Sequence, residues 1–174
     1  MGRLGDSLLR LREDSVGFRM DETMVGEHEL APGFGSAGPP KKGRIELCLT
    51  WGPSSIARWL TPTSKDFLRQ PISGTITAEG LCVGAPCEGT LELLYLKEHK
   101  IRYLLKFEAL GRRLNYEGEK VNIRPWNLHV SHTTCLGRIT EVDSGALVST
   151  SVVRFRLTGL PRFLLSLRVT RHRL

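Results

Sequence analysis

Three charged residues of this sequence stand where the second neighbours along the chain are apolar, which is the position of an inward-facing residue on a strand. Glu22 lies between Met20 and Met24 in this sense, and Lys120 and Arg154 take equivalent positions in two later segments. Because an unpaired buried charge costs several kcal/mol, we expect at least two of the three to pair inside the domain. The group either forms a structural ion pair or orients a carboxylate or hydroxyl of a lipophilic ligand. The predicted ligand-binding residues are Glu22, Met24, Tyr103, Tyr116, Lys120, Trp126 and Arg154.

Catalysis is the weaker interpretation of the same groups. Glu22 could act as a base beside Lys120 or Arg154, as in a small isomerase or cyclase. Ser131 and His132 are only neighbours in sequence, whereas catalytic triads are defined by spatial arrangement. No Gly-x-Ser-x-Gly turn exposes a serine nucleophile. We therefore predict no catalytic residues and favour a binding protein, with the enzyme kept as an alternative.

Four cysteines raise the question of a metal site. Cys82 and Cys87 flank residues 83–86, which resemble a hairpin turn that would bring the two thiols together. His129 and His132 could complete a zinc site, but a three-residue spacing on a strand directs the two imidazoles to opposite faces. We predict small buried thiols that stay reduced, with no metal and no cofactor.

The middle of the chain contains three successive segments in which apolar and polar residues alternate. In the second of them Tyr103, Leu105 and Phe107 share one face, and we expect them to be buried with Leu91 and Leu93. The connections between the segments are short. They predict antiparallel neighbours, because a parallel crossover needs a dozen or more residues.

Other parts of the chain predict further strands and a few short helices. The expected elements are a helix over 4–13, strands over 18–26, 44–51, 128–142, 146–157 and 167–170, and two short helices over 53–70. The helices over 53–70 should cover one end of the domain, beside Trp51, Trp59 and Phe67. The last strand, 167–170, would close the sheet.

The predicted fold class is therefore all-β, an antiparallel up-and-down barrel of about eight to ten strands with short helices at the ends, calycin- or lipocalin-like in outline. It has an N-terminal helical extension (1–16), one barrel domain (17–170) and a basic tail (171–174).

Composition restricts the class of protein further. With 40% hydrophobic and 25% charged residues among 174, the chain resembles a globular domain rather than a disordered segment. No apolar run approaches the roughly 20 residues of a membrane-spanning helix and no signal segment is visible, so we predict a cytoplasmic protein without a transmembrane segment. The net charge of +7 comes largely from the C-terminal arginines and residues 41–44, and basic residues elsewhere alternate with apolar ones. We predict no nucleic-acid partner.

Several short motifs carry a resemblance to a known family. They are Met20-x-Glu22-x-Met24-x-Gly26, Gly74-Thr75, Gly89-x-Leu91-x-Leu93, Ile101-Arg102-Tyr103, Gly118-x-Lys120, Trp126 with Thr133-Thr134, and Pro161-x-Phe163. Together they resemble the all-β accessory domain found with bacterial cholesterol-oxidase-like flavin oxidoreductases of the GMC type, often alongside an α/β-hydrolase domain. The resemblance covers residues 17–170. Met20, His132 and Cys135 stand where the family has Phe, Asp and Thr.

The resemblance implies an accessory module of lipid or sterol metabolism with a flavin oxidoreductase or hydrolase partner. It does not imply oxidase activity, because the flavin-binding glycine fingerprint is missing from the chain. Three functions remain open: a carrier of a lipophilic small molecule, an interaction module for such an enzyme, and a small barrel enzyme. A closed cavity would favour the carrier, a filled barrel with an exposed apolar patch the module, and a carboxylate and cation converging in a cleft the enzyme.

Overall fold

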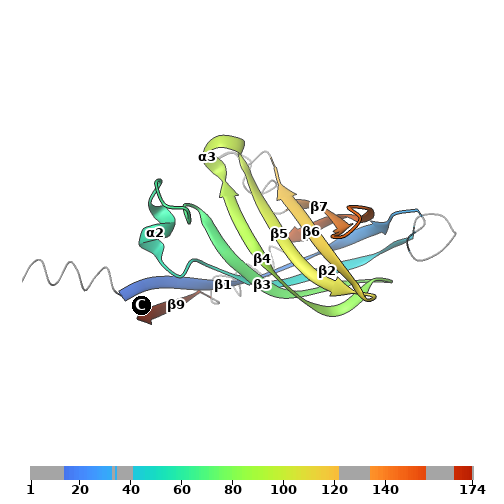
Figure 1. The fold of residues 1–174 in the computed structure, drawn as a ribbon, viewed down its shortest axis with the longest axis horizontal. Helices are drawn as coiled ribbons and strands as arrows, with labels where there is room; N and C mark the ends of the chain where they lie inside the picture. The colour runs from blue at the N-terminus through green and yellow to red at the C-terminus, as the bar shows by residue number, and fades with distance from the viewer. Residues whose placement is uncertain (1–13, 33, 35–40, 122–133, 156–166, 174) are drawn as a thin grey trace, which may run out of the picture.

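The structure is a computed structural model that describes residues 14–32, 34, 41–121, 134–155 and 167–173. Its elements are β1 (Asp14–Leu30), β2 (Lys42–Trp51), α2 (Ile56–Leu60), β3 (Arg69–Ala78), β4 (Cys82–Leu94), α3 (Tyr95–Glu98), β5 (Lys100–Ala109), β6 (Arg112–Lys120), β7 (Thr134–Glu141), β8 (Leu147–Phe155) and β9 (Arg168–Arg173) (Figure 1). The elements are almost entirely strands, as the alternation in the sequence predicts.

Eight of the strands form a closed antiparallel barrel. The strand order is β2-β3-β4-β5-β6-β7-β8-β1, and β1 also pairs with β2, which closes the ring. Consecutive strands are neighbours throughout, so the up-and-down barrel predicted from the sequence is confirmed. An eight-stranded barrel has an interior just wide enough for side chains to fill it.

The first strand is long enough to pair with β8 and with β9 over different residues. Residues Met24 to Leu30 of β1 pair with β8, whereas Asp14 to Arg19 pair with β9. The ninth strand therefore extends one end of β1. The prediction that residues 167–170 close the sheet is wrong, because the pairing of β1 with β2 closes it. The ninth strand also includes Arg171 and Arg173, which were predicted to form a basic tail.

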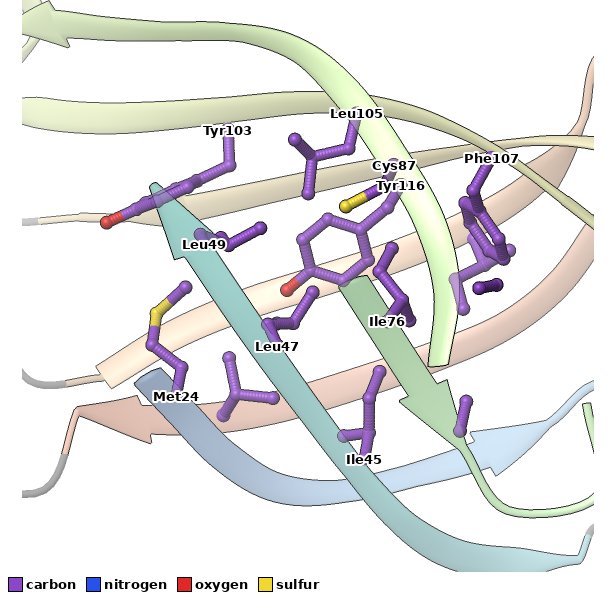
Figure 2. Packing of buried hydrophobic residues seen from close by; sticks show 14 of the residues in the cluster. Met24, Ile45, Leu47, Leu49, Ile76, Cys87, Tyr103, Leu105, Phe107 and Tyr116 are labelled. Carbon is purple, nitrogen blue, oxygen red and sulfur yellow. The ribbon is translucent and has the colours of Figure 1, made fainter. Parts of the chain in front are cut away.

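The interior holds the apolar faces that the alternation predicts. Tyr103, Leu105 and Phe107 have exposed fractions of 1%, 1% and 4%, whereas Lys106 on the other face of β5 is exposed. Leu91 is buried with them, and Leu93 packs partly buried against the same core. Figure 2 shows side chains from several strands converging in the barrel interior.

The connection between β5 and β6 shows why these strands pair as neighbours. Leu110 and Gly111 both have positive φ, 52° and 70°. Two central residues of this kind form the type I′ turn, whose twist matches that of a hairpin. The predicted short turn is confirmed.

Two segments fold differently from the sequence prediction. Residues 64–68 form turns instead of a second helix, and β3 begins at Arg69, so that Pro71 lies within a strand. Proline is tolerated there because the pairing of β3 with β2 ends at Ile72, and no bond to β2 is lost. Residues 83–86 are part of β4 and not a hairpin turn, because the turn lies earlier, where Gly80 has a φ of 78°.

The start of β1 differs in the same way, since residues 14–16, assigned by the sequence to the helical extension, belong to the strand. The helix predicted over 4–13 lies outside the described residues.

Near one end of the barrel, α2 brings an aromatic cluster together. Ser55 is the N-cap of α2, and its hydroxyl accepts a hydrogen bond from the Arg58 amide. The Phe18 ring lies 6.0 Å from Trp51 and 5.7 Å from Trp59, both edge to face. The two tryptophans are thus linked through Phe18, which the sequence analysis did not include.

Candidate functional site

A buried ion pair lies inside the barrel between β1 and β6. Lys120 Nζ is 2.7 Å from Glu22 Oε1, and the two residues are 3% and 5% exposed. Strands β7 and β8 separate β1 from β6 in the sheet, so the pair joins strands that are not neighbours. The prediction that at least two of the three charged residues pair inside the barrel is confirmed.

Two aromatic side chains complete the surroundings of the Glu22 carboxylate. The Tyr103 hydroxyl donates to Glu22, with oxygen separations of 3.0 and 3.2 Å, and the Trp51 Nε1–H donates to Glu22 Oε2 over 3.2 Å. Lys120 Nζ also lies 5.1 Å from the centre of the Tyr103 ring, within the range of a cation–π interaction. The carboxylate therefore has three donors around it, one of them charged.

The alternation on β6 explains how Lys120 reaches this position. Residues 114, 116, 118 and 120 face inward, and the third of them is a glycine. A Cβ on Gly118 would lie 2.7 Å from the Tyr116 ring and 2.8 Å from Cys135 Sγ. Since no real Cβ fits so closely, a glycine is required beside the large Tyr116 side chain.

Burial keeps the phenols near this site protonated. The pKa of Tyr103 is raised well above its ordinary value by burial and then by the neighbouring Glu22 charge. The same two causes raise the pKa of Tyr95 to about 12. Both side chains are therefore neutral hydrogen-bonding groups at physiological pH.

Met24 and Tyr116, two further predicted site residues, belong to the core. Both are 0% exposed, and Figure 2 shows them within the interior. The Tyr116 hydroxyl is 3.9 Å from Cys135 Sγ, and burial raises the pKa of Cys135 to about 12. Neither Met24 nor Tyr116 has a hydrogen bond to Glu22 within the part of the chain that the structure describes.

Arg154 lies on the outside of the barrel, so its predicted place in the interior is wrong. The register of β7 and β8 shifts between Ile139 and Thr140, which oppose Ser149 and Leu147. This bulge inserts Val148 as an extra residue and reverses the parity of the later residues of β8. Val153 consequently faces inward, and Arg154 is exposed. Trp126, the remaining predicted residue, lies outside the described residues.

A rim of partly buried apolar and aromatic residues accompanies the ion pair. These residues pack against the core without being enclosed by it: Trp51, Leu93, Tyr95 and Phe155. Register places Leu93 near the cluster, because it opposes Ile101, which in turn opposes Lys120. Trp51 donates to Glu22, Phe155 opposes Met24, and burial together with the Glu22 charge raises the pKa of Tyr95. The sequence places Trp51 beside the segment 53–70 that covers one end of the domain, but does not identify it as a partner of Glu22.

The barrel interior beyond this rim is filled. A ligand-sized internal cavity would leave accessible area on the side chains that line it, yet Met24, Leu47, Tyr116 and Ile139 are all 0% exposed. Two hollows, of 730 and 770 Å³, lie on the outer face of β3 to β6, beside residues such as Ser73 and Lys106. Partly buried apolar side chains flank the core at the rim, where the buried charges lie, and also at Phe34 and Cys82.

A second buried polar group ties other strands together. His28 Nδ1 is 2.9 Å from Ser149 Oγ, and Nε2 is 3.1 Å from the Glu79 carbonyl oxygen. The carbonyl can only accept, which places a proton on Nε2. Burial lowers the pKa of His28, and Ser149 is 0% exposed, so this pair acts as a structural link and not as a catalytic dyad.

Metal-ligating residues do not gather in the parts of the chain that the structure describes, where no group of three or more is found. All four cysteines are free thiols. Within the same residues, no helix has the length and apolar character needed to cross a membrane.

No family model matches the chain, and no match was found among curated proteins or solved structures. The function is therefore argued from the site.

Proposed function

We propose that this protein is a non-catalytic barrel that binds a lipophilic small molecule, such as a lipid or sterol, at the end that contains Glu22 and Lys120. The observation that carries the proposal is the buried ion pair itself, placed beside a rim of partly buried apolar and aromatic side chains. An apolar ligand body would contact the rim, and its polar group would meet the charged cluster.

A purely structural role accounts poorly for the pair. Taking two charges out of water costs nearly as much as their attraction returns, and well-packed apolar residues of similar volume are often as stabilising. Lys120 carries three N–H groups, and among the described residues one hydrogen bond is formed, to Glu22. The ammonium group can therefore offer a further donor to a ligand.

Catalysis by the same cluster is disfavoured by its geometry. A general base needs an accessible lone pair, but the Glu22 carboxylate already accepts from Lys120, Tyr103 and Trp51. The neutral phenol of Tyr103 donates a hydrogen bond to that carboxylate, so its hydroxyl hydrogen is occupied as well. The cluster is suited to orienting a polar group and not to moving a proton.

An enzyme partner is the second part of the proposal. It rests on the resemblance to domains that accompany flavin oxidoreductases and hydrolases, with the chain working in the cytoplasm, where free thiols such as Cys48 stay reduced. An alternative role as an interaction module is supported by the filled barrel interior and by one feature of the outer surface. Leu136 and Val152 oppose each other on β7 and β8 and are 50% and 43% exposed.

Tryptophan fluorescence tests the binding proposal directly, because Trp51 lies against Glu22. We would titrate the wild-type chain with oleate, cholesterol and methyl laurate. Saturable changes with at least one of them are expected, and they should disappear in the double variant Glu22→Gln/Lys120→Met, which removes both charges together. Lys106→Met, on the outer face of β5, is the matched control and should bind as the wild type does. A flat response of the wild type to all three lipids would rule out the proposal.

A further inference from the structure

One buried amide group near the same end of the barrel, that of Gln70, has a nitrogen without a hydrogen-bond partner among the described residues. Gln70 is 2% exposed on the inner face of β3, and its Oε1 accepts a hydrogen bond of 2.6 Å from Trp59 Nε1. An indole N–H can only donate, so the amide oxygen must face Trp59. The amide nitrogen, Nε2, is then directed elsewhere. It is buried and has no hydrogen-bond partner among the described residues.

The N–H groups of this nitrogen have lost their hydrogen bonds to water on burial and have gained none from the described residues. Buried polar groups in proteins nearly always have a partner, and one that lacks it calls for a physical explanation. An apolar side chain of the same length would fill this position without that penalty. The simplest occupant is an acceptor atom that the chain itself does not supply, from either a ligand or water.

The position of Gln70 connects it with the proposed binding end. It lies two residues before Ile72, which opposes Trp51, the donor to Glu22. Its hydrogen-bond partner Trp59 meets the same Trp51 through the ring of Phe18. The amide and the ion pair thus belong to one end of the barrel.

The charges at this end restrict what the acceptor can be. Lys120 is the one cation in contact with Glu22 among the described residues, and their charges cancel. A ligand carboxylate would add a buried negative charge next to Glu22 with no cation left to balance it, which is unfavourable in a poorly solvated site. A neutral oxygen accepts a hydrogen bond from an amide N–H without this penalty.

We infer that the site selects lipids whose polar group is a neutral hydrogen-bond acceptor, such as an ester or ketone carbonyl, and that Gln70 is a specificity-determining residue that donates to it. The inference rests on the proposed function. It goes beyond that proposal by excluding free fatty acids as preferred ligands and by assigning the donor.

Methyl laurate and laurate provide a matched pair of probes, because they share the acyl chain and differ in charge at the head. The wild-type chain should bind the ester at least about tenfold more tightly than the acid at neutral pH. Gln70→Met keeps the length of the side chain and removes the donor, and should weaken ester binding by about tenfold, the equivalent of one hydrogen bond. Lys106→Met, at an exposed position on the outer face of β5, is the control and should bind the ester as the wild type does.

The outcomes separate the inference from the proposed function. Equal affinity for the two probes would overturn the selectivity for a neutral head group. Unchanged ester binding by Gln70→Met would overturn the role of the amide, and either result would leave lipid binding intact. If Gln70→Met does not fold, the ratio of ester to acid affinity in the wild type still tests the selectivity for a neutral head group. Absence of binding for both probes, and for oleate and cholesterol, would overturn both.

Discussion

Removing the positive charge of the ion pair is the perturbation whose cost the structure defines best. In Lys120→Met, Glu22 would remain 5% exposed without a cation, although Tyr103 and Trp51 would still donate to it. Breaking a buried pair in this way costs about 3–5 kcal/mol. Because two donors remain, we expect the lower end, about 3 kcal/mol of unfolding free energy, or ~6–12 °C in Tm for a chain of this size.

Urea unfolding followed by circular dichroism measures this loss. The double variant Glu22→Gln/Lys120→Met should recover most of it, because no uncompensated charge remains and a glutamine oxygen can still accept from Tyr103. Arg154→Met is the matched control, and since Arg154 is exposed on the outer face its effect should stay within about 0.5 kcal/mol. A loss below about 1 kcal/mol in Lys120→Met, or a double variant as unstable as the single one, would refute the reasoning.

Three further predictions concern the fold. Leu105→Asp should prevent folding, whereas the same change at exposed Lys106 should be tolerated, as circular dichroism would show; equal tolerance would contradict the burial pattern. Gly137→Ala should lower stability by about 1–3 kcal/mol in urea unfolding, because its Cβ would lie 2.5 Å from the Tyr116 hydroxyl. Burial lowers the pKa of His28 below 6.5, so the unfolded chain binds the proton more readily, and stability should fall as pH drops from 6.5 towards the folded-state pKa. His28→Phe should flatten that slope in unfolding curves between pH 7 and 5, and an unchanged slope would assign it to other groups.

Alternation in the sequence is a sufficient guide to the barrel and to the ion pair. Each strand residue faces opposite to the next, so the inward positions of Tyr103, Leu105 and Lys120 follow from counting along unbroken strands. The prediction that at least two of the three charges pair follows from the cost of an unpaired buried charge, and the structure identifies the two as Glu22 and Lys120.

Counting fails where a strand is irregular. The bulge at Val148 changes the parity of β8, and no residue type marks it in the sequence, so counting places Arg154 on the wrong face. The inward position of Gln70 is not predicted, for a related reason. The sequence predicts short helices over 53–70, whereas Gln70 and Pro71 belong to β3. Pro71 is tolerated in this strand because the pairing of β3 with β2 ends at Ile72. The orientation of the Gln70 amide depends on Trp59, a contact that only the folded chain reveals.

The indole N–H resonance of Trp51 reports most directly on the central claim, because this group donates to Glu22 at the proposed binding end. We would record nitrogen–proton correlation spectra during a titration with methyl laurate and assign the indole signals with a Trp59→Phe variant and a Trp51→Phe variant. Binding at the Glu22–Lys120 end predicts that the Trp51 indole signal shifts in a saturable way, while the backbone amide of Lys106 on the outer face does not move. A Trp51 signal that stays constant while amides of the outer face of β3 to β6 shift would contradict the account and place the lipid on the surface of the barrel.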